Sequence, residues 1–289
     1  MKRPVNVREF GFINVDKETG VSSSAIVNKI KWLSGVPCGH MGTLDPLASG
    51  VLPVGVGNAT RLFDYFLEKK KEYVAEFTFG AYADTLDTTG VVEYIGRVPT
   101  ASEVQKVLPS FEGKILQMPP KYSAKNVNGR RGYELARAGV EFELSPKEVE
   151  IYALTFLGEG ATKNSYKIKV ECGGGTYIRS LGRDIAEALS THAVMSALRR
   201  TKSGVFTIEK SVKIADLTEE NINEYLIPTE SVLPFERLEL TAKNRAKIFD
   251  GVAIETDAKD GQYKFYREGV FYGIATVENG FAKLTKKLC

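Results

Sequence analysis

The chain has 289 residues, of which 43% are hydrophobic and 26% are charged, and its formal net charge is +3. This composition permits a sizeable buried core and excludes a disordered or collagen-like chain, and no apolar run is long enough to span a membrane. The small basic excess permits a nucleic-acid partner without requiring one. Because the N-terminus also lacks the apolar stretch of a signal peptide, we expect a cytoplasmic protein.

The N-terminal part of the chain predicts a strand at 12–15 followed by a helix. Apolar side chains recur at helical spacing between Ile26 and Leu33. The serines at 22–24 can cap the start of this helix, and Gly35 can end it.

The next segment, 39–50, has the sequence GHMGTLDPLASG and predicts a glycine-rich loop. Pro46 pushes Asp45 away from the helical conformation, and the glycines permit turns and close approaches that larger residues forbid. A carboxylate and the imidazole of His40 on such a loop suit catalysis. The same composition also fits a polar turn with a capping aspartate.

Two strands are predicted on either side of a short helix. The first spans 51–54, where Pro53 indicates an edge position or an irregular ladder. A helix follows at 58–66, and the second strand at 73–79 places alternate apolar side chains on one face. Tyr73 begins that face, and its pattern alone predicts core packing.

The middle of the chain is predicted to alternate turns, strands and one helix. The segment 84–90 is rich in turn residues and leads into a strand at 91–94. Ser102 can cap a helix that continues to Leu108, and a further strand ends near Met118.

A basic insertion is predicted at 117–140, opened by two prolines that break the preceding strand. It contains a single acid, and a turn or two of helix is expected around 133–137. This mixture of positive charge and aromatic rings suits phosphate contacts and base stacking, although a solvated surface loop would look similar. The candidate RNA-binding residues are Lys121, Tyr122, Lys125, Arg130, Arg131 and Arg137.

The second half of the chain predicts strands at 149–154 and 166–170, then a glycine turn and a helix at 177–189. Arg179 would lie near the start of this helix, where a glycine turn can also bind a phosphate through backbone N–H groups. Short strands punctuated by glycines predict a small β domain at 238–289.

The three cysteines are odd in number and widely spaced, which argues against a disulfide framework. A zinc site could be assembled only from Cys38, His40, Cys172 and His192. No Cys-x-x-Cys spacing supports it, so we predict no metal. His192 is better explained as a hydrogen-bonded structural residue.

Five segments resemble, in order, the motifs of the TruB family of tRNA pseudouridine synthases, which isomerise uridine 55 in the T loop. DKETGVSS at 16–23 is similar to the family's opening motif, and GHMGTLDP at 39–46 to its nucleophile motif. KEY at 71–73, PPKYSA at 119–124 and GTYIRS at 175–180 resemble its tyrosine strand, RNA-contacting insertion and arginine motif. Five ordered matches are far more specific than one short pattern.

The resemblance extends over most of 12–206 and departs from the family at Glu18, where proline is usual, while Met41 fills a variable position. It implies an α+β fold. A mixed, largely antiparallel sheet of pseudouridine-synthase type would form a catalytic domain at 1–237 that carries the RNA-binding insertion. A small PUA-like β domain would follow at 238–289.

The resemblance also implies the chemistry. Asp45 would act as nucleophile or base, and Tyr73 would stack on or act at a flipped uracil. Arg179 would be the positively charged partner of the Asp45 carboxylate. No cofactor is needed, because uracil is detached, rotated and rejoined without redox change. The implied substrate-binding residues are His40, Tyr177, Leu198 and Lys17. Leu198 could equally be a plain core residue, and Lys17 a solvated surface lysine.

The implied partner is the T arm of tRNA, and we expect a monomer that requires no protein partner and no membrane. Two other functions fit less well. An RNA-binding chaperone without catalysis would not need Asp45, Tyr73 and Arg179 together, and turnover would distinguish it. A related synthase that works within a guide-RNA complex would favour additional basic tails for assembly, which this chain does not show.

Overall fold

The computed structural model describes residues 10–67, 69–122, 138–140, 142–239 and 251–288, together with residue 248 and the backbone at 126–127 and 130–131. No helix in this part of the chain is long and apolar enough to cross a membrane.

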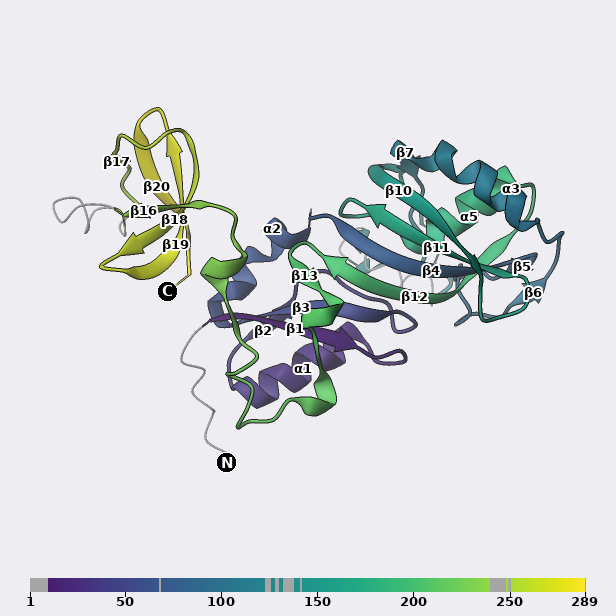
Figure 1. Cartoon of the computed structure of the whole chain (residues 1–289), viewed down its shortest axis with the longest axis horizontal. Helices are drawn as coiled ribbons and strands as arrows, with labels where there is room; N and C mark the ends of the chain where they lie inside the picture. Colours follow the sequence, from purple (N-terminus) through teal and green to yellow (C-terminus); the bar gives the residue numbers. More distant parts are fainter. Residues whose placement is uncertain are drawn as a thin grey trace.

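An 11-stranded sheet organises most of the described residues (Figure 1). Its strands are β1 (Gly11–Lys17), β2 (Cys38–His40), β3 (Ser49–Val56), β4 (Lys71–Phe79), β7 (Gly113–Gln117), β10 (Lys147–Glu159), β11 (Ser165–Cys172), β12 (Ala193–Ser203), β13 (Phe206–Thr207), β14 (Val212–Lys213) and β15 (Ile227–Pro228). The main path runs β14-β1-β3-β12-β4-β11-β10-β7. Pairing is antiparallel except between β1 and β14 and between β3 and β12. The α+β class with a mixed, largely antiparallel sheet is confirmed.

Helices pack on this sheet at both of its ends (Figure 1). They are α1 (Ser23–Ser34), α2 (Phe63–Leu67), α3 (Ala101–Val107) and α5 (Ile178–Ala188), with 3-10 turns η1 (Gly57–Leu62), η2 (Leu108–Phe111), η3 (Ile208–Lys210), η4 (Ile214–Asp216) and η5 (Thr229–Val232). Ile30 of α1, Val104 of α3 and Leu181 of α5 are buried in one core cluster. A Cβ on Gly182 would lie 2.4 Å from the ring of Phe77, so glycine is what lets α5 approach β4 closely.

The expected caps of the first helix are confirmed. The Ser22 side chain accepts the N–H of Ala25, and Gly35 ends α1 in the left-handed conformation with φ 70°. The expected cap at Ser102 is wrong. Thr100 caps α3 instead, because its hydroxyl and the Glu103 carboxylate form a reciprocal capping box two residues earlier in the chain.

Two strand predictions need correction. Of the segment 91–94, only Glu93–Tyr94 (β6) is a strand, and it pairs with β5 (Ala81–Tyr82). Pro53 is not on an edge strand, since β3 lies inside the sheet. The ladder beside it is irregular, as expected, because β12 pairs with β3 only at Ser49 and Gly50 and β2 only at 54–56.

A second, five-stranded sheet occupies the C-terminal region. It contains β16 (Glu236–Glu239), β17 (Ile254–Glu255), β18 (Gly261–Arg267), β19 (Val270–Glu278) and β20 (Phe281–Lys287), in the order β16-β18-β19-β20-β17. Ile274 and Leu288 share a buried cluster with Leu62 and Phe66 of the larger sheet's flank. A small C-terminal β domain is therefore confirmed, while the boundary at 237/238 and the PUA-like assignment stay predictions.

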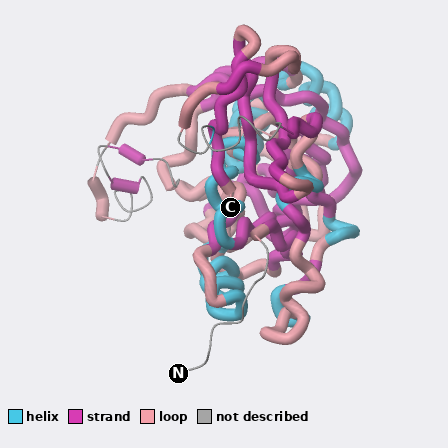
Figure 2. The backbone as a smooth tube through the Cα atoms, turned by 90° about the vertical axis from the view of Figure 1, so that its left-hand side faces the viewer, coloured by secondary structure: helices cyan, strands magenta, loops and turns pink. Residues whose placement is uncertain are grey.

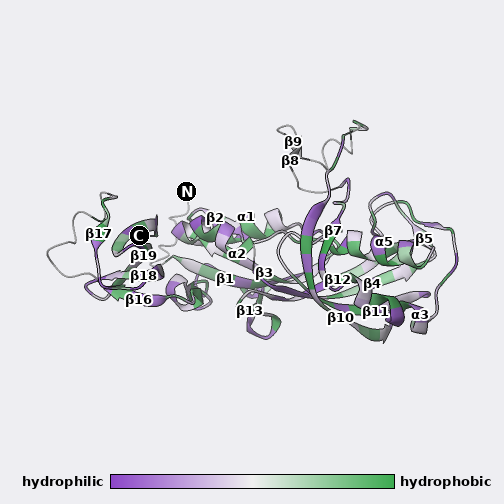
Figure 3. Ribbon diagram, turned by 90° about the horizontal axis from the view of Figure 1, so that it is seen from above, coloured by the Kyte–Doolittle hydropathy of each residue, from purple (hydrophilic) through white to green (hydrophobic). Residues whose placement is uncertain are grey.

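Two short strands, β8 (Asn126–Val127) and β9 (Arg130–Arg131), pair within the predicted insertion. They stand away from both sheets (Figures 2 and 3). The helical turn expected at 133–137 lies outside the described residues.

Candidate active site around Asp45

Asp45 lies on the loop between β2 and β3, and its side chain is 38% exposed. Where the loop ends, Gly50 has φ 100° and pairs in parallel with Arg200 of β12. A Cβ on Gly50 would lie 2.2 Å from the carbonyl oxygen of Arg200, so glycine is required there. The loop is thus fixed directly to the central strand of the sheet.

The segment 16–23 holds the other side of this loop. The Ser23 hydroxyl accepts the N–H of Leu44 at 2.9 Å and donates to the carbonyl oxygen of the same residue at 2.8 Å. The N–H of Gly20 donates to the carbonyl oxygen of Pro46 at 2.7 Å. Two segments predicted to belong to one site therefore lie in contact.

Arg200 supports the loop through hydrogen bonds to its backbone, a role that the sequence did not indicate. Its guanidinium is 1% exposed and donates to the carbonyl oxygens of Val51 at 2.7 Å, Gly42 at 3.0 Å and Thr43 at 3.4 Å. A buried cation is tolerated when hydrogen bonds satisfy its donors. Arg200 therefore fixes the backbone on which Asp45 is carried.

The expected contact between Arg179 and Asp45 is present. Arg179 Nη2 lies 2.9 Å from Asp45 Oδ2, and Arg179 Nη1 lies 3.5 Å from the carboxylate of Asp87. The guanidinium also donates to the carbonyl oxygens of Thr85 at 2.9 Å and Tyr122 at 3.0 Å. Four acceptors thus fix a side chain that is only 7% exposed.

Asp87 is a second site residue that the sequence did not single out, since it lies in the turn-rich segment 84–90. Its side chain is 5% exposed and accepts the N–H of Thr89 at 3.0 Å. The neighbouring Thr88 N–H donates to the carbonyl oxygen of Met195 in β12 at 3.1 Å. The turn is therefore attached to the sheet, and it holds a buried carboxylate behind Arg179.

Tyr73 is buried at 6% exposure in β4, directly opposite Arg200 of β12. Burial raises the pKa of its phenol, and the positive charge of Arg200 opposes that shift. Tyr73 is consequently a neutral phenol at physiological pH. It packs in the same core cluster as Leu44 and Leu198.

His40 and Lys17 lie beside the loop. Burial, and then the charge of Arg200, lower the pKa of His40, so its imidazole is neutral at physiological pH. Lys17 is fully buried and donates to the carbonyl oxygens of Val21 at 2.6 Å and Glu18 at 2.9 Å. Burial lowers its pKa to about 8. Lys17 is therefore not a solvated surface lysine, and a phosphate contact would require it to leave these partners.

Lys71, at the start of β4, is a further buried amine. It is 7% exposed and donates to the carbonyl oxygens of Leu67 at 2.7 Å and Lys69 at 2.8 Å. Burial, followed by the charge of Arg200, lowers its pKa to about 8. A neutral amine keeps the N–H groups for both hydrogen bonds.

We expect Lys71 to make the free energy of unfolding rise with pH between about 8 and 10.5. In that window the unfolded chain binds the proton and the folded chain does not, so stability increases by at most about 1.4 kcal/mol per pH unit. Urea unfolding of the parent and of Lys71→Met at both pH limits would measure this. The free energy of unfolding of the parent should increase relative to that of the variant as pH rises. A difference between the two that does not change with pH would contradict the prediction.

The remaining predicted substrate-binding residues lie nearby. Tyr177 is half-buried and precedes the first residue of α5, two positions before Arg179. Leu198 is buried in β12 opposite Ala75 of β4. His192, by contrast, is exposed and packs edge to face on Tyr82, with ring centroids 5.6 Å apart.

The predicted RNA-binding residues are only partly described. Lys121 is exposed, and the Tyr122 hydroxyl donates to Asp84 at 2.9 Å. Arg130 and Arg131 form β9, but their side chains lie outside the described residues. Lys125 and Arg137 lie outside them entirely.

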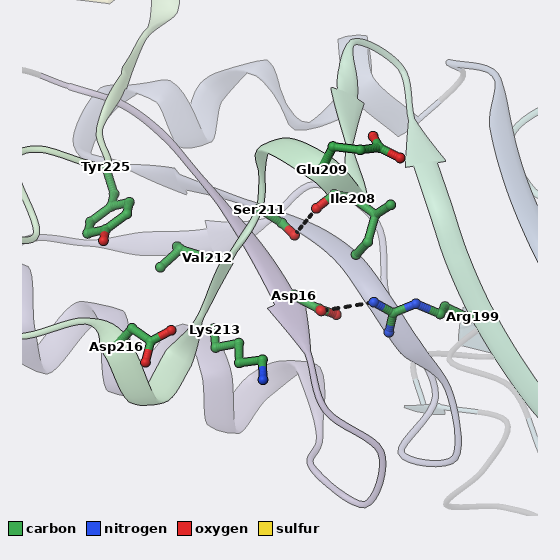
Figure 4. A pocket seen from close by; sticks show the side chains of 9 residues that line it. All are labelled: Asp16, Arg199, Ile208, Glu209, Ser211, Val212, Lys213, Asp216 and Tyr225. Atoms are coloured by element: carbon green, nitrogen blue, oxygen red, sulfur yellow. Dashed lines mark hydrogen bonds and ion pairs between the residues drawn. The ribbon is translucent and has the colours of Figure 1, made fainter.

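A separate groove of about 620 Å³ lies beside β1 and β14 (Figure 4). Its charged lining residues include Arg199, which forms an ion pair with Asp16 at 2.9 Å, and Lys213. None of the predicted site residues lines this groove. The candidate site is instead the open loop surface around Asp45.

Comparison with known proteins identifies a family for this chain. Residues 31–178 match the model of the TruB family pseudouridylate synthase N-terminal domain, and 179–238 match the tRNA pseudouridylate synthase B C-terminal domain. Among curated relatives, tRNA pseudouridine synthase B of Clostridium tetani is 38% identical, with 96% of this chain and 99% of that protein aligned. The enzyme of the same name from Syntrophomonas wolfei is 40% identical over 82% of this chain and 81% of its own.

Solved structures show the same fold. A Cbf5-Nop10-Gar1 complex matches with a TM-score of 0.72 and 26% identity, covering 100% of this chain and 88% of that chain. An H/ACA RNP bound to a substrate RNA containing 2'-deoxyuridine matches at 0.70 and 26%, with the same coverage. With two family models side by side along the chain and relatives aligned over nearly all of it, this protein belongs to the TruB family of tRNA pseudouridylate synthases.

Proposed function

We propose that this protein isomerises uridine 55 in the T loop of tRNA, that the carboxylate of Asp45 carries the chemistry, and that no cofactor takes part. The observation that supports this most is the ion pair of Asp45 with Arg179 at 2.9 Å, on a loop fixed by the sheet. Arg179 orients the carboxylate, and Asp87 holds Arg179 from behind. A preorganised charged group of this kind is what catalysis at a single base requires.

The reaction breaks the bond between N1 of uracil and C1′ of ribose and forms a bond between C5 and C1′. The hydrogen at C5 leaves as a proton, and N1 gains one, so the change is an isomerisation. Asp45 can attack the sugar carbon, attack the base or remove a sugar proton, and its placement suits each of these roles.

The target uridine must leave the T loop to reach Asp45, which costs a few kcal/mol of unstacking. We propose that Tyr73 contacts the flipped base and that Tyr177, Leu198 and His40 bind the nucleotides around it. Tyr73 and His40 are suited to neutral contacts, because their pKa shifts keep the phenol and the imidazole uncharged. We reassign Lys17 from phosphate binding to support of the catalytic loop, because its buried amine donates to the carbonyl oxygen of Pro46 at 3.4 Å as well as to those of Val21 and Glu18.

The proposed reaction can be tested by incubating the purified protein with an unmodified tRNA transcript and mapping pseudouridine along it. We expect modification at uridine 55 alone, with the other uridines of the T arm as internal controls. A product at another position would contradict the assignment of the site.

The insertion is proposed to contact tRNA phosphates. Replacing Arg130 and Arg131 by Glu should then weaken tRNA binding and flatten the dependence of log K on log salt by about 0.7–0.9 for each lost phosphate contact. Lys210 and Lys213 offer a matched control, because both are exposed and lie in η3 and β14, outside the insertion. If the parent and the Arg130/Arg131 variant have equal salt slopes, the insertion does not contact phosphates and is a solvated surface loop.

A second candidate is a synthase that depends on protein partners, because one matched Cbf5 structure is a complex with Nop10 and Gar1 and another is a complex with Nop10. The stronger similarity, at 38–40% identity, is to proteins named tRNA pseudouridine synthase B. We therefore propose a monomer that acts alone on the T arm. Turnover by the purified chain, with light scattering to measure its mass, separates the two.

A further inference from the structure

The first turn of α5, which carries Arg179, is joined to the end of β7 and the residues after it. The N–H of Tyr177 donates to Gln117 Oε1 at 2.8 Å, and the Ser180 hydroxyl donates to the carbonyl oxygen of Met118 at 2.9 Å. Arg183 also donates to Met118 O, at 3.1 Å. Together with the bond from Arg179 to Tyr122 O, these contacts tie one helical turn to the segment 117–122.

Gln117 has the most constrained place in this joint. Its backbone pairs with Lys147 in the sheet, and its side chain is 1% exposed. The helix needs an external partner at this end, since its N-cap residue, Tyr177, forms no capping hydrogen bond with its own side chain. The amide oxygen of Gln117 supplies that partner from a strand of the main sheet.

The other end of this amide has no evident structural use. Gln117 Nε2 is buried and has no hydrogen-bond partner among the described residues. A buried donor without a partner is costly, so a residue selected for stability alone would be expected to satisfy both ends or to be apolar. The retained feature is the acceptor oxygen, which faces the backbone between the glycine turn and Arg179.

We propose that Gln117 is a positioning residue for the isomerisation: its amide oxygen fixes Tyr177 and the first turn of α5, so that Arg179 meets Asp45. This inference rests on the proposed function. Gln117 plays this role through its hydrogen bond to the N–H of Tyr177 and not through a contact with Asp45. It acts through the helix start, whose displacement by a fraction of an ångström would move the guanidinium relative to the carboxylate.

Two substitutions separate the acceptor oxygen from the volume of the side chain. Gln117→Met keeps an unbranched chain of similar size and removes the acceptor, whereas Gln117→Glu keeps an acceptor oxygen and removes the unpartnered N–H groups. A carboxyl oxygen is also favourable at a helix N-terminus. We expect Gln117→Met to slow single-turnover pseudouridine formation about tenfold to a hundredfold, with the tRNA dissociation constant unchanged. Gln117→Glu should restore a rate near that of the parent.

Thr100→Ala is the control for a purely structural effect, because it removes the capping box of α3 and leaves the joint intact. It should lower the melting temperature without changing the single-turnover rate at saturating enzyme. Ser180→Ala removes a second bond of the same joint with a small change in volume and should slow the reaction at unchanged tRNA affinity. If Gln117→Met does not fold, Ser180→Ala tests the positioning role in its place.

Either of two results would overturn the positioning role: folded Gln117→Met reacts at the rate of the parent, or Gln117→Glu reacts as slowly as Gln117→Met. If Gln117→Met does not fold, a parental rate for Ser180→Ala would overturn it. None of these outcomes touches the proposed function, which is tested separately by pseudouridine formation at uridine 55 by the parent and by Asp45→Asn.

Discussion

Asp45→Asn should give a folded protein that binds tRNA and forms no pseudouridine. Asn keeps the size of Asp and much of its ability to form a turn, so a structural role would survive at a cost of about 1 kcal/mol or less. A carboxylate that acts as nucleophile or base would be lost outright. The backbone of the loop should keep its place, because it is held by Ser23 and Arg200 rather than by the Asp45 side chain.

Three measurements check this expectation: urea unfolding, tRNA affinity and pseudouridine mapping on the same preparation. Asp84→Asn is a suitable control, since Asp84 is an exposed carboxylate that accepts a hydrogen bond from Tyr122, whereas the ion pairs of Arg179 are with Asp45 and Asp87. It should keep activity. An Asp45→Asn protein that is both unfolded and inactive would support only the capping role.

Arg179→Met should lower both stability and activity, and the two losses should separate when Asp87 is also changed. Removing the guanidinium leaves the Asp87 carboxylate buried at 5% exposure without its cation. Breaking a buried pair in this way costs about 3–5 kcal/mol. The loss of a charged group that orients Asp45 should reduce the rate by about 100- to 1000-fold.

Adding Asp87→Asn to Arg179→Met should recover most of the stability, because the uncompensated charge is gone and Asn can still accept the N–H of Thr89. Activity should stay low, because the partner of Asp45 is still missing. The control is Arg97→Met, which breaks an exposed ion pair with Glu103 and should lower stability far less than Arg179→Met does. Recovery of activity together with stability in the double variant would show that Arg179 acts through folding alone.

The sequence predicted the parts of the site that depend on local chemistry. The loop around Asp45 and the caps of α1 follow from glycine, proline and serine positions, and helical periodicity placed Arg179 near the start of α5. The contact between Asp45 and Arg179 came from the resemblance, since the two lie 134 positions apart and no spacing rule connects positions so distant.

The parts that local patterns do not show were missed. Strand β12 lies at the centre of the main sheet, yet in its sequence AVMSALRRTKS only Val194 and Thr201 are of the β-branched and aromatic types enriched in strands. It pairs with β4 across more than a hundred residues of chain. The burial of Arg200 and the place of Asp87 behind Arg179 follow from that pairing, so neither residue could be identified from its neighbours.

The pattern of strands and glycines predicted the C-terminal sheet but not how that sheet packs against the rest of the chain. Leu288 is fully buried in a cluster that includes Phe66 and Met41, and Arg61 donates to the carbonyl oxygen of Lys287 at 2.6 Å. Met41 belongs to the loop segment 39–50 that carries Asp45. The small sheet therefore packs in a cluster that includes a residue of this loop segment.

Release of tritium from tRNA labelled at C5 of uridine tests most directly whether Asp45 carries out an isomerisation at uridine. Bond formation at C5 expels the hydrogen there, so label appears in water only when pseudouridine forms. With enzyme in excess, the parent should release the label of uridine 55 and should release none from a transcript with cytidine at that position. Asp45→Asn, folded and bound to the same tRNA, should release none. Release by Asp45→Asn at a rate near that of the parent would contradict the catalytic role of this carboxylate.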